Sequence, residues 1–349
     1  LDAFKKVLFS IPNTDIRILS NFSDIGNKKA FFINQYKGTK INKGFSLLLN
    51  LLKLYRFINK NRNAIYIYLT YGNSIDLLFM KIIAKAPHHL IDIHEAIAQD
   101  IDSNVVLKAK FKKLYKYRIK SVISHSKRTD DFLSEYGYKQ KRLSVPHFRY
   151  IFPKEYNIAS IPNEIQKAID SRKINLLFFG NLNKSKGIDI LIEAINQLDD
   201  NTADSINIII AGKDFDGAID RVALKPNRHV KVFRRHISDD ELRFLYHSVD
   251  YLLLPYRKTS QSGILEMAFY FKRPIIASNV PYFRKILCEF PSFGVLAGNT
   301  SKSYAIALTN IINQYDQNHF FTEKDYARYE NRTEIQTFIT DFTKWIKTK

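Results

Sequence analysis

Hydrophobic and polar positions alternate along this chain with two different periods. Short runs rich in β-branched and aromatic residues predict buried strands, as at 64–70 and 206–211. Between such runs, apolar residues recur every three or four positions, as they do along one face of a helix. Strands that alternate with helices in this way are typical of a parallel sheet covered on both faces.

The alternation occurs in two series. The first predicts strands at 14–22, 30–36, 64–70, 89–94, 121–126 and 142–148, with helices at 44–59, 75–85, 104–120 and 129–136. The second predicts strands at 175–180, 206–211, 230–233, 251–254, 275–277 and 294–296, helices between them, and further helices at 301–315 and 334–347. Ser238 and Glu241 form a capping-box pattern at the start of one intervening helix. We therefore predict an α/β chain of two Rossmann-like, doubly wound parallel-sheet domains facing a cleft.

Residues 149–171 interrupt this rhythm with prolines in a polar setting, which indicates a junction between domains. We predict an N-terminal domain over 1–150, a linker over 151–171, a C-terminal domain over 172–322, and a helical segment over 323–349 that packs back on the N-terminal domain. Residues 1–11 have helical rather than strand spacing, so we expect that the first strand of the N-terminal domain is absent.

The formal net charge of +20 is concentrated in the first domain. Residues 1–150 contain 27 Lys and Arg against 11 Asp and Glu, and seven of these cations lie from Lys108 to Lys120 on a predicted amphipathic helix. Such a helix suits an anionic membrane surface, and it is equally compatible with a solvated face above an apolar stripe. Nucleic acid is not expected as a partner, because no base-reading motif accompanies the charge.

The class of protein is limited further by its single cysteine and its modest apolar runs. Cys288 alone excludes an internal disulfide, and no apolar run approaches the roughly 20 residues of a membrane-spanning helix. No secretion signal opens the chain. We expect a cytoplasmic protein, either soluble or peripheral at the inner face of the cell membrane.

Two turns of the second series carry candidate chemistry. The strand at 175–180 stops at Gly180, and a loop with Lys184 and Lys186 leads into a helix. The strand at 251–254 is followed by a polar turn and another helix start. Unpaired amides at a helix N-terminus, together with an ammonium group, favour an anion such as a diphosphate. No Asp-x-Asp pair or cluster of ligand spacing sits at a predicted strand end, so we expect no metal.

Six motifs of the second half resemble, in order, the donor-binding domain of GT-B glycosyltransferases, above all the retaining family 4, or glycosyl transferases group 1. They are Gly180-Asn-Leu-Asn-Lys-Ser-Lys-Gly187 with the helix after it, Ile210-Ala-Gly-Lys213, Ile237-Ser-Asp-Asp-Glu-Leu242, Asp250 with Leu254-Pro-Tyr256, Ser260-Gln-Ser-Gly263, and Arg273-Pro-Ile-Ile-Ala-Ser278. The resemblance covers about Ile174 to Leu287. It implies that a sugar moves from a nucleotide diphosphate sugar to an acceptor held by the first domain, without a bound metal or cofactor.

The resemblance also assigns residues on the donor side. The family's diphosphate-binding lysine corresponds to Lys186, whereas its partner arginine is replaced by Asn181, so we expect Lys184 or Arg257 to substitute. Other predicted donor-side residues are Gly180, Arg234, Arg235 and Tyr256, which follow strands on the ligand edge.

The second turn departs from the family pattern. Most members have two glutamates separated by seven residues, and Thr259 and Met267 occupy those places here, with Glu266 one residue off. One residue rotates a helical side chain by about a quarter turn. The chain resembles instead a subgroup with a Gln-Ser-Gly turn. In it the amides of Ser262 and Gly263 face the diphosphate, Ser260 or Gln261 faces the sugar, and Glu266 is the candidate ribose ligand.

In the first half, histidines end three predicted strands. His94 resembles the strand-end histidine that the family places beside the sugar, so we predict it as a catalytic residue together with Lys186. His125 and His147 fall on the same edge and are candidate acceptor contacts.

The sequence thus predicts a retaining, metal-independent glycosyltransferase that acts on a saccharide or lipid-linked acceptor in cell-surface polysaccharide or glycolipid synthesis, such as bacterial capsule or lipopolysaccharide. Two alternatives stay open. One is an inverting GT-B transferase or an epimerase with Asp92, Glu95 or Asp100 as the base. The other is a non-catalytic subunit that binds a sugar or a membrane, since the expected arginine and glutamates are missing.

Overall fold

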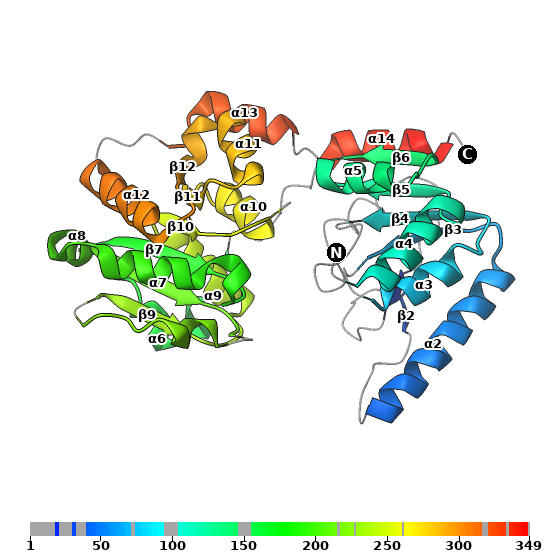
Figure 1. The fold of residues 1–349 in the computed structure, drawn as a ribbon, viewed down its shortest axis with the longest axis horizontal. Helices are drawn as coiled ribbons and strands as arrows, with labels where there is room; N and C mark the ends of the chain where they lie inside the picture. Colours follow the sequence, from blue (N-terminus) through cyan, green and yellow to red (C-terminus); the bar gives the residue numbers. More distant parts are fainter. Residues whose placement is uncertain are drawn as a thin grey trace. The chain divides into compact units, whose positions relative to one another are not determined.

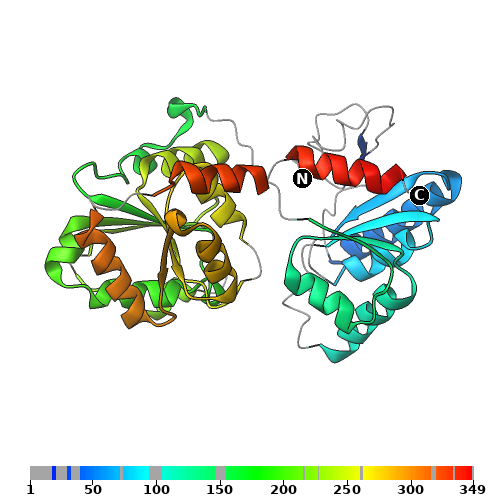
Figure 2. The same ribbon diagram turned by 90° about the horizontal axis from the view of Figure 1, so that it is seen from above.

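The computed structural model describes residues 18–20, 30–32, 40–70, 74–93, 104–145, 155–214, 217–226, 228–259, 262–315, 320–332 and 335–347. The chain forms two compact units (Figures 1 and 2). One unit contains residues 1–148 and 334–349, and the other contains residues 149–333. No helix in the described ranges is both long and apolar enough to cross a membrane.

The C-terminal unit has a six-stranded parallel sheet, whose order is β9-β8-β7-β10-β11-β12. Its strands are β7 (Ile174–Phe179), β8 (Ile206–Ala211), β9 (Val230–Phe233), β10 (Tyr251–Leu254), β11 (Ile275–Ser278) and β12 (Gly294–Ala297). This order reverses between β7 and β10, the point of a doubly wound sheet outside which ligands bind. The two turns that the sequence singled out follow these two strands.

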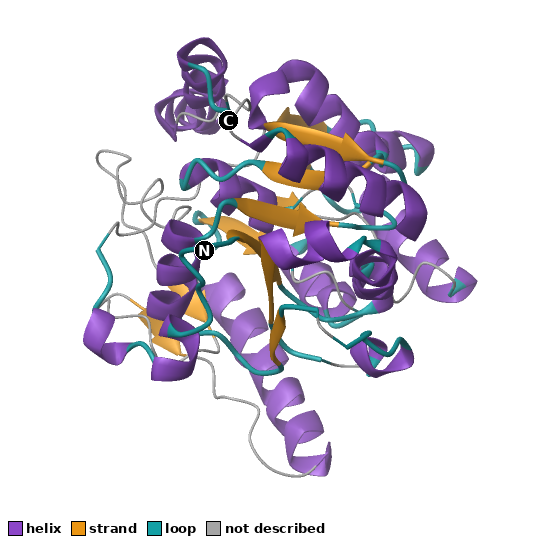
Figure 3. Ribbon diagram, turned by 90° about the vertical axis from the view of Figure 1, so that its left-hand side faces the viewer, coloured by secondary structure: helices purple, strands orange, loops and turns teal. Residues whose placement is uncertain are grey.

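Helices cover both faces of this sheet (Figure 3). They are α6 (Asn163–Gln166), α7 (Ile188–Gln197), α8 (Asp200–Ser205), α9 (Asp239–Ser248), α10 (Gly263–Tyr270), α11 (Pro281–Glu289), α12 (Ser301–Asn313) and α13 (Glu323–Arg332), with 3-10 turns η1 (Ile158–Ser160), η2 (Lys184–Lys186), η3 (Ala218–Arg221) and η4 (Pro291–Phe293). Strand residues alternate between two cores. Leu177 packs with α9 and α10, and Leu176 and Phe178 pack with α7 and α12. The predicted capping box of α9 is confirmed.

The N-terminal unit has a four-stranded parallel sheet in the order β3-β4-β5-β6 and a separate parallel pair, β1-β2. The strands are β1 (Ile18–Ser20), β2 (Ala30–Phe32), β3 (Ile65–Leu69), β4 (His88–Ile93), β5 (Ser121–Ser124) and β6 (Lys141–Ser144). The helices are α2 (Lys40–Lys60), α3 (Asp76–Ile83), α4 (Val105–Tyr117), α5 (Lys127–Glu135) and α14 (Ile335–Lys347). The helix predicted at residues 1–11 lies outside the described residues.

Two cores also flank the four-stranded sheet. Side chains of α2, α3, α4 and α5 form one core, in which Met80 of α3 is fully buried. The other contains Leu90 of β4, Ile123 of β5 and Phe342 of α14, and Figure 2 shows α14 in red beside the strands of this unit. The α/β prediction of two parallel-sheet domains is therefore confirmed, with α14 completing the second face.

The domain borders differ from those that the sequence predicted. Ile161, Ile165 and Ala168 are buried in the core of the C-terminal unit, so at least residues 161–168 of the predicted linker 151–171 belong to that unit. Their helical spacing was hidden by polar neighbours and Pro162. The predicted segment 323–349 divides, because Tyr329 of α13 is buried in the C-terminal core whereas α14 belongs to the N-terminal unit.

Candidate functional site

The turn after β7 and the turn after β10 are in backbone contact. Gly187 has a φ of +71°, and a Cβ atom added to it would lie 1.9 Å from the Pro255 carbonyl oxygen. Only glycine allows this approach. Gly180 has a φ of +127° and its N–H donates to the Ala211 carbonyl at 3.0 Å, which joins the end of β7 to the end of β8. The two predicted turns therefore form one continuous backbone surface.

Asn183 organises the first turn from within. Its Oδ1 accepts hydrogen bonds from the backbone N–H of Lys186 at 3.0 Å and from the Ser185 hydroxyl at 2.8 Å. The N–H of Gly187 donates to the Lys184 carbonyl at 3.1 Å. These two amides precede α7 and are used inside the turn, so they are not available to an anion. The positive charge of this turn comes from its lysine side chains.

Lys186 is held above an aromatic ring. Its ammonium lies 3.9 Å from the centroid of the Tyr256 ring, a distance suited to a cation–π interaction. Tyr256 is only 1% exposed. Burial raises the pKa of its phenol, an effect that the Ser262 side chain partly offsets, so the phenol is neutral near pH 7. We predicted Tyr256 as a donor contact, but its burial makes it the support that positions Lys186.

Arg257 ties the two turns together. Its guanidinium donates to both carboxylate oxygens of Asp189, at 2.6 and 2.8 Å, and to the Lys184 carbonyl at 2.6 Å. Burial would raise the pKa of the Asp189 carboxyl, but the hydrogen bonds and charge of Arg257 lower it below its ordinary value. Because Asp189 compensates its charge, Arg257 does not replace the arginine missing at Asn181. Lys184 is exposed and stays the predicted substitute.

The second turn ends at the start of α10, where two N–H groups have no acceptor within the helix. Ser262 is the N-cap of α10, and its hydroxyl accepts from the Leu265 N–H at 3.3 Å. The first bond along the helix runs from the Glu266 N–H to the Ser262 carbonyl at 3.2 Å. The N–H groups of Gly263 and Ile264 therefore have no intrahelical acceptor, and they can bind an anion as predicted for this turn.

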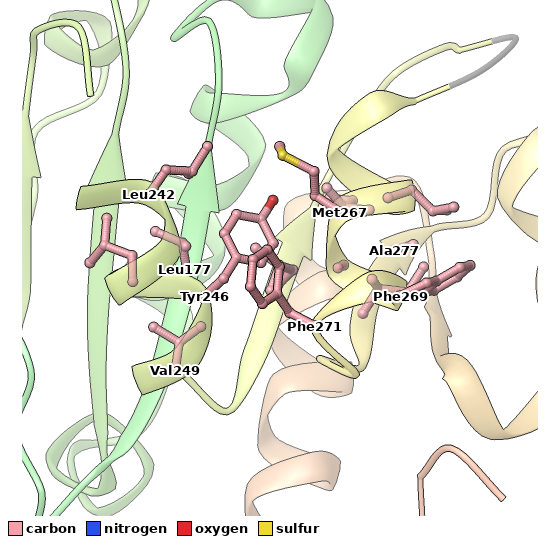
Figure 4. Close-up of a cluster of buried hydrophobic side chains, with 14 of the residues drawn as sticks. Leu177, Leu242, Tyr246, Val249, Met267, Phe269, Phe271 and Ala277 are labelled. Carbon is pink, nitrogen blue, oxygen red and sulfur yellow. The ribbon is translucent and has the colours of Figure 1, made fainter. Parts of the chain in front are cut away.

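Glu266 faces the interior of the unit. Its side chain is buried, and its Oε2 accepts a hydrogen bond of 2.5 Å from the Tyr329 hydroxyl of α13. This contact disagrees with the predicted role of Glu266 as a ribose ligand. Met267, at the family's glutamate position, packs in the core with Leu242 and Tyr246 (Figure 4). No carboxylate thus occupies that position.

The arginines after β9 are paired with acidic residues. Arg234 donates to the two carboxylate oxygens of Asp220 at 2.7 and 2.5 Å, and the side chain of Arg234 is 44% exposed. Arg235 lies 2.6 Å from Glu241 and 2.9 Å from Glu164. Both arginines therefore have structural partners already, and Arg234 is the more exposed of the two predicted candidates.

In the N-terminal unit, His125 and Asp92 form a buried pair at the carboxyl edge of the sheet. The His125 Nε2 lies 2.6 Å from Asp92 Oδ1, and its Nδ1 lies 3.2 Å from the Val145 carbonyl oxygen. Their side chains are 2% and 4% exposed. Both ring nitrogens are therefore engaged, which disagrees with an acceptor contact by His125. The predicted site residues that lie outside the described residues are His94, His147, Ser260 and Gln261.

Two parts of this site were not predicted from the sequence. Asn183 could have been found, because an asparagine three residues before a structured amide is a capping signal. Asp189 could not, because its partner Arg257 is 68 positions away along the chain. Within the described ranges no group of three or more His, Cys, Asp or Glu side chains could hold a metal ion.

Residues 161–328 match the family model of glycosyl transferases group 1. No curated protein sequence matches the chain.

Solved structures of other proteins are similar to nearly the whole chain. HepE of Anabaena, in complex with UDP and glucose, has a TM-score of 0.67 at 14% identity, over 92% of this chain and 86% of that one. WaaG, a glycosyltransferase involved in lipopolysaccharide biosynthesis, has a TM-score of 0.67 at 12% identity, over 98% and 94%. The sucrose-phosphate synthase of Thermosynechococcus elongatus has 0.68 at 13% identity, over 91% and 82%. The fold is therefore GT-B, and together with the match over residues 161–328 it identifies the chain as a glycosyltransferase.

Proposed function

We propose that the chain transfers a sugar from a nucleotide diphosphate sugar, and that the two contacting turns hold the diphosphate. The observation that carries this proposal is the position of Lys186, fixed above Tyr256 where the two turns meet. Its charge and the free amides at the start of α10 suit a diphosphate. HepE, which has a similar fold, binds UDP and UDP-glucose, and this supports a donor of that class.

The proposed reaction proceeds with retention and without a metal ion. The acceptor hydroxyl forms the new bond to the anomeric carbon on the face from which the diphosphate leaves. As the bond between that carbon and the phosphate oxygen breaks, the leaving diphosphate takes the hydroxyl proton. Lys186 and the α10 amides stabilise the negative charge that develops. His94 is proposed beside the sugar, as the family resemblance implies.

The proposed acceptor is a saccharide or a lipid-linked saccharide at the inner face of the cell membrane, in cell-surface polysaccharide or glycolipid synthesis. The basic segment from Lys108 to Lys120 supports this location. Phe111, Leu114 and Tyr115 of α4 are buried, whereas Lys110 and its basic neighbours along the helix are exposed. Cations on an exposed face attract anionic lipids by about 1 kcal/mol each, so binding to anionic vesicles should weaken as salt increases.

Substitution of Lys186 tests the proposed site. Lys186→Ala should lower transfer by about a hundredfold or more, as loss of a group that stabilises transition-state charge does. Lys285→Ala, which removes an exposed lysine of α11, is the matched control. A thermal-shift panel of nucleotides and nucleotide sugars identifies the donor first, because a ligand at 100 times its Kd stabilises by about 2.7 kcal/mol. Normal turnover by Lys186→Ala would exclude the assignment.

A non-catalytic sugar-binding subunit is the second candidate. It is favoured by the engagement of Arg257 by Asp189 and of Glu266 by Tyr329, since neither side chain restores the charges missing from the family pattern. Hydrolysis of any nucleotide sugar by the purified protein, lost in Lys186→Ala, would exclude it.

A sugar transfer with inversion at the anomeric carbon is the third candidate function. The buried pairing of Asp92 with His125 disfavours Asp92 as the base, and Glu95 and Asp100 lie outside the described residues. The anomeric configuration of the product, determined by NMR, separates inversion from retention.

A further inference from the structure

Helix α2 has two apolar faces, and the part of the chain that the structure describes covers only one of them. Leu54 and Ile58 are buried in the core of the N-terminal unit. A second row of large apolar side chains lies along a different face, with exposed fractions that fall from 83% to 37% along the helix. This row, the α2 stripe, consists of Ile41, Phe45, Leu48, Leu52 and Tyr55.

The spacing of the α2 stripe keeps it on one line. Steps of four, three, four and three residues return to the same side of a helix with 3.6 residues per turn. Within 41–49, no residue whose burial the structure gives is buried, whereas Asn50 is 1% exposed. In Figures 1 and 3 the first turns of α2 extend beyond the neighbouring helices of the unit. Contiguous exposed apolar residues of this kind mark an interaction surface.

The described chain from residue 40 to residue 120 exposes charge of one sign. Among the described residues from 40 to 120, the acidic side chains are Asp76 and Asp92, and both are buried. Twelve lysines and arginines are exposed in the same ranges, including Lys53, Arg56 and Lys60 of α2 itself. The ammonium of Lys85, two residues after the end of α3, lies 4.6 Å from the ring centroid of Tyr55, so a cation also lies directly against the stripe.

These charges distinguish between two possible partners of the α2 stripe, a second copy of the chain and an anionic lipid surface. If a second copy packed its α2 against this one, the basic side chains beside the stripe would face each other without an acidic partner, and like charges in such positions repel. An anionic lipid surface instead pairs with the cations and receives the apolar side chains.

We infer that α2 docks on an anionic lipid surface, with the α2 stripe inserted at the level of the acyl-chain boundary and the cations at the phosphates. This inference deepens the proposed membrane location, on which it rests, because it adds hydrophobic insertion by α2 to electrostatic attraction at α4. Insertion predicts that part of the binding persists when salt screens the charges.

The first test compares vesicle binding by two variants. Phe45→Glu combined with Leu48→Glu should weaken binding to vesicles of equal parts phosphatidylglycerol and phosphatidylcholine by about tenfold or more. Ile306→Glu is the matched control, because Ile306 of α12 is 54% exposed, as Leu48 is. It should bind as the unchanged protein does. Equal binding by the double variant and the control would overturn the inference.

The second test measures how deeply the α2 stripe enters the lipid bilayer. Phe45→Trp should shift its fluorescence to the blue on vesicles and be quenched by lipids brominated on the acyl chains, whereas Ile306→Trp should not. Both variants retain the native Trp345, whose signal is common to the pair. Failure to bind vesicles, absence of quenching, or a concentration-dependent dimer that Phe45→Glu dissociates would each contradict docking on lipid.

Donor hydrolysis in solution separates this inference from the proposed function. Because α2 and the two turns belong to different units, the double glutamate variant should hydrolyse nucleotide sugar at the unchanged rate without lipid. If the protein binds vesicles but hydrolyses no nucleotide sugar, the docking of α2 stands and the proposed enzyme activity is rejected. If it hydrolyses nucleotide sugar but does not bind vesicles, the activity stands and the docking is rejected.

Discussion

The two contacting turns and helix α2 differ in how closely the rest of the chain packs around them. An atom added at Gly187 would meet the Pro255 carbonyl at 1.9 Å, whereas one added at Gly44 of α2 would meet nothing within 4 Å. The two regions also differ in whether their cations have acidic partners. Arg257 is bound by Asp189, but no Asp or Glu occurs in residues 40–70 around the cations of α2. The chain completes the first region itself and leaves the second for an external partner.

Alanine at Gly187 should give the largest effect on stability. It would need both a strained positive φ and a displaced Pro255 carbonyl, so we expect Gly187→Ala to lower the free energy of unfolding by about 3 kcal/mol. The displacement separates the two turns, so the affinity for nucleotide should fall as well. Urea unfolding and nucleotide titration measure the two effects. A variant that unfolds and binds normally would show that the contact between the turns is loose.

The ion pair between Asp189 and Arg257 should contribute less. Both side chains are partly exposed, at 19% and 36%, so solvent screens their attraction. We expect Arg257→Met and Asp189→Asn each to destabilise by about 1 kcal/mol, and the double variant to cost little more than either. A double-mutant cycle measures this coupling. Additive losses would indicate that the two side chains act separately.

The same pair predicts a dependence on pH. Since folding lowers the pKa of Asp189 from its ordinary 3.8, the stabilisation is complete above that value and is lost as pH falls through the lower pKa of the folded state. The difference in stability between the unchanged protein and Asp189→Asn should be constant from neutral pH to about pH 5 and shrink below about pH 4. A difference that changed near neutral pH would contradict the assignment.

Alanine at Gly44 should give the smallest effect, with the opposite sign to alanine at Gly187. Its added methyl group meets no neighbour, and alanine loses less backbone freedom in a helix than glycine does. Gly44→Ala should therefore stabilise by about 0.5–1 kcal/mol. Helical content by circular dichroism and urea unfolding check this, and a loss of stability would mean that another part of the molecule occupies the space beside Gly44.

Much of the C-terminal fold could be predicted because its signals are local. The runs 206–211, 230–233 and 251–254 coincide with β8, β9 and β10. The first and the last of these strands are buried along their whole length, and strands of that kind have nearly continuous apolar sequences. The start of α9 is set by Ser238 and Glu241, which act within one turn. Periodicity alone could not show which apolar face of α2 is covered, because burial depends on what packs against a helix.

The predicted donor-side residues also differ in whether local sequence or tertiary contacts determine their position. Lys186 and Gly263 lie in the two turns where the sequence placed them, because a turn between a strand and a helix is a local pattern. The positions of Tyr256 and Glu266 depend on tertiary contacts, which the sequence pattern does not show. Tyr256 is buried beneath the ammonium of Lys186, and Glu266 accepts a hydrogen bond from Tyr329. Family spacing placed a ligand one residue from Glu266, but it could not show that the helix turns this carboxylate toward α13.

Helix α14 has a consequence for dividing the protein into fragments. Phe342 supplies a buried side chain to a unit whose other parts end at residue 148, so the chain leaves that unit once and returns to it at 334. A contiguous piece that stops near residue 148 would expose Leu90 and Ile123 to water. Expressing the N-terminal half alone therefore requires residues 335–347 to be grafted onto it or supplied as a peptide.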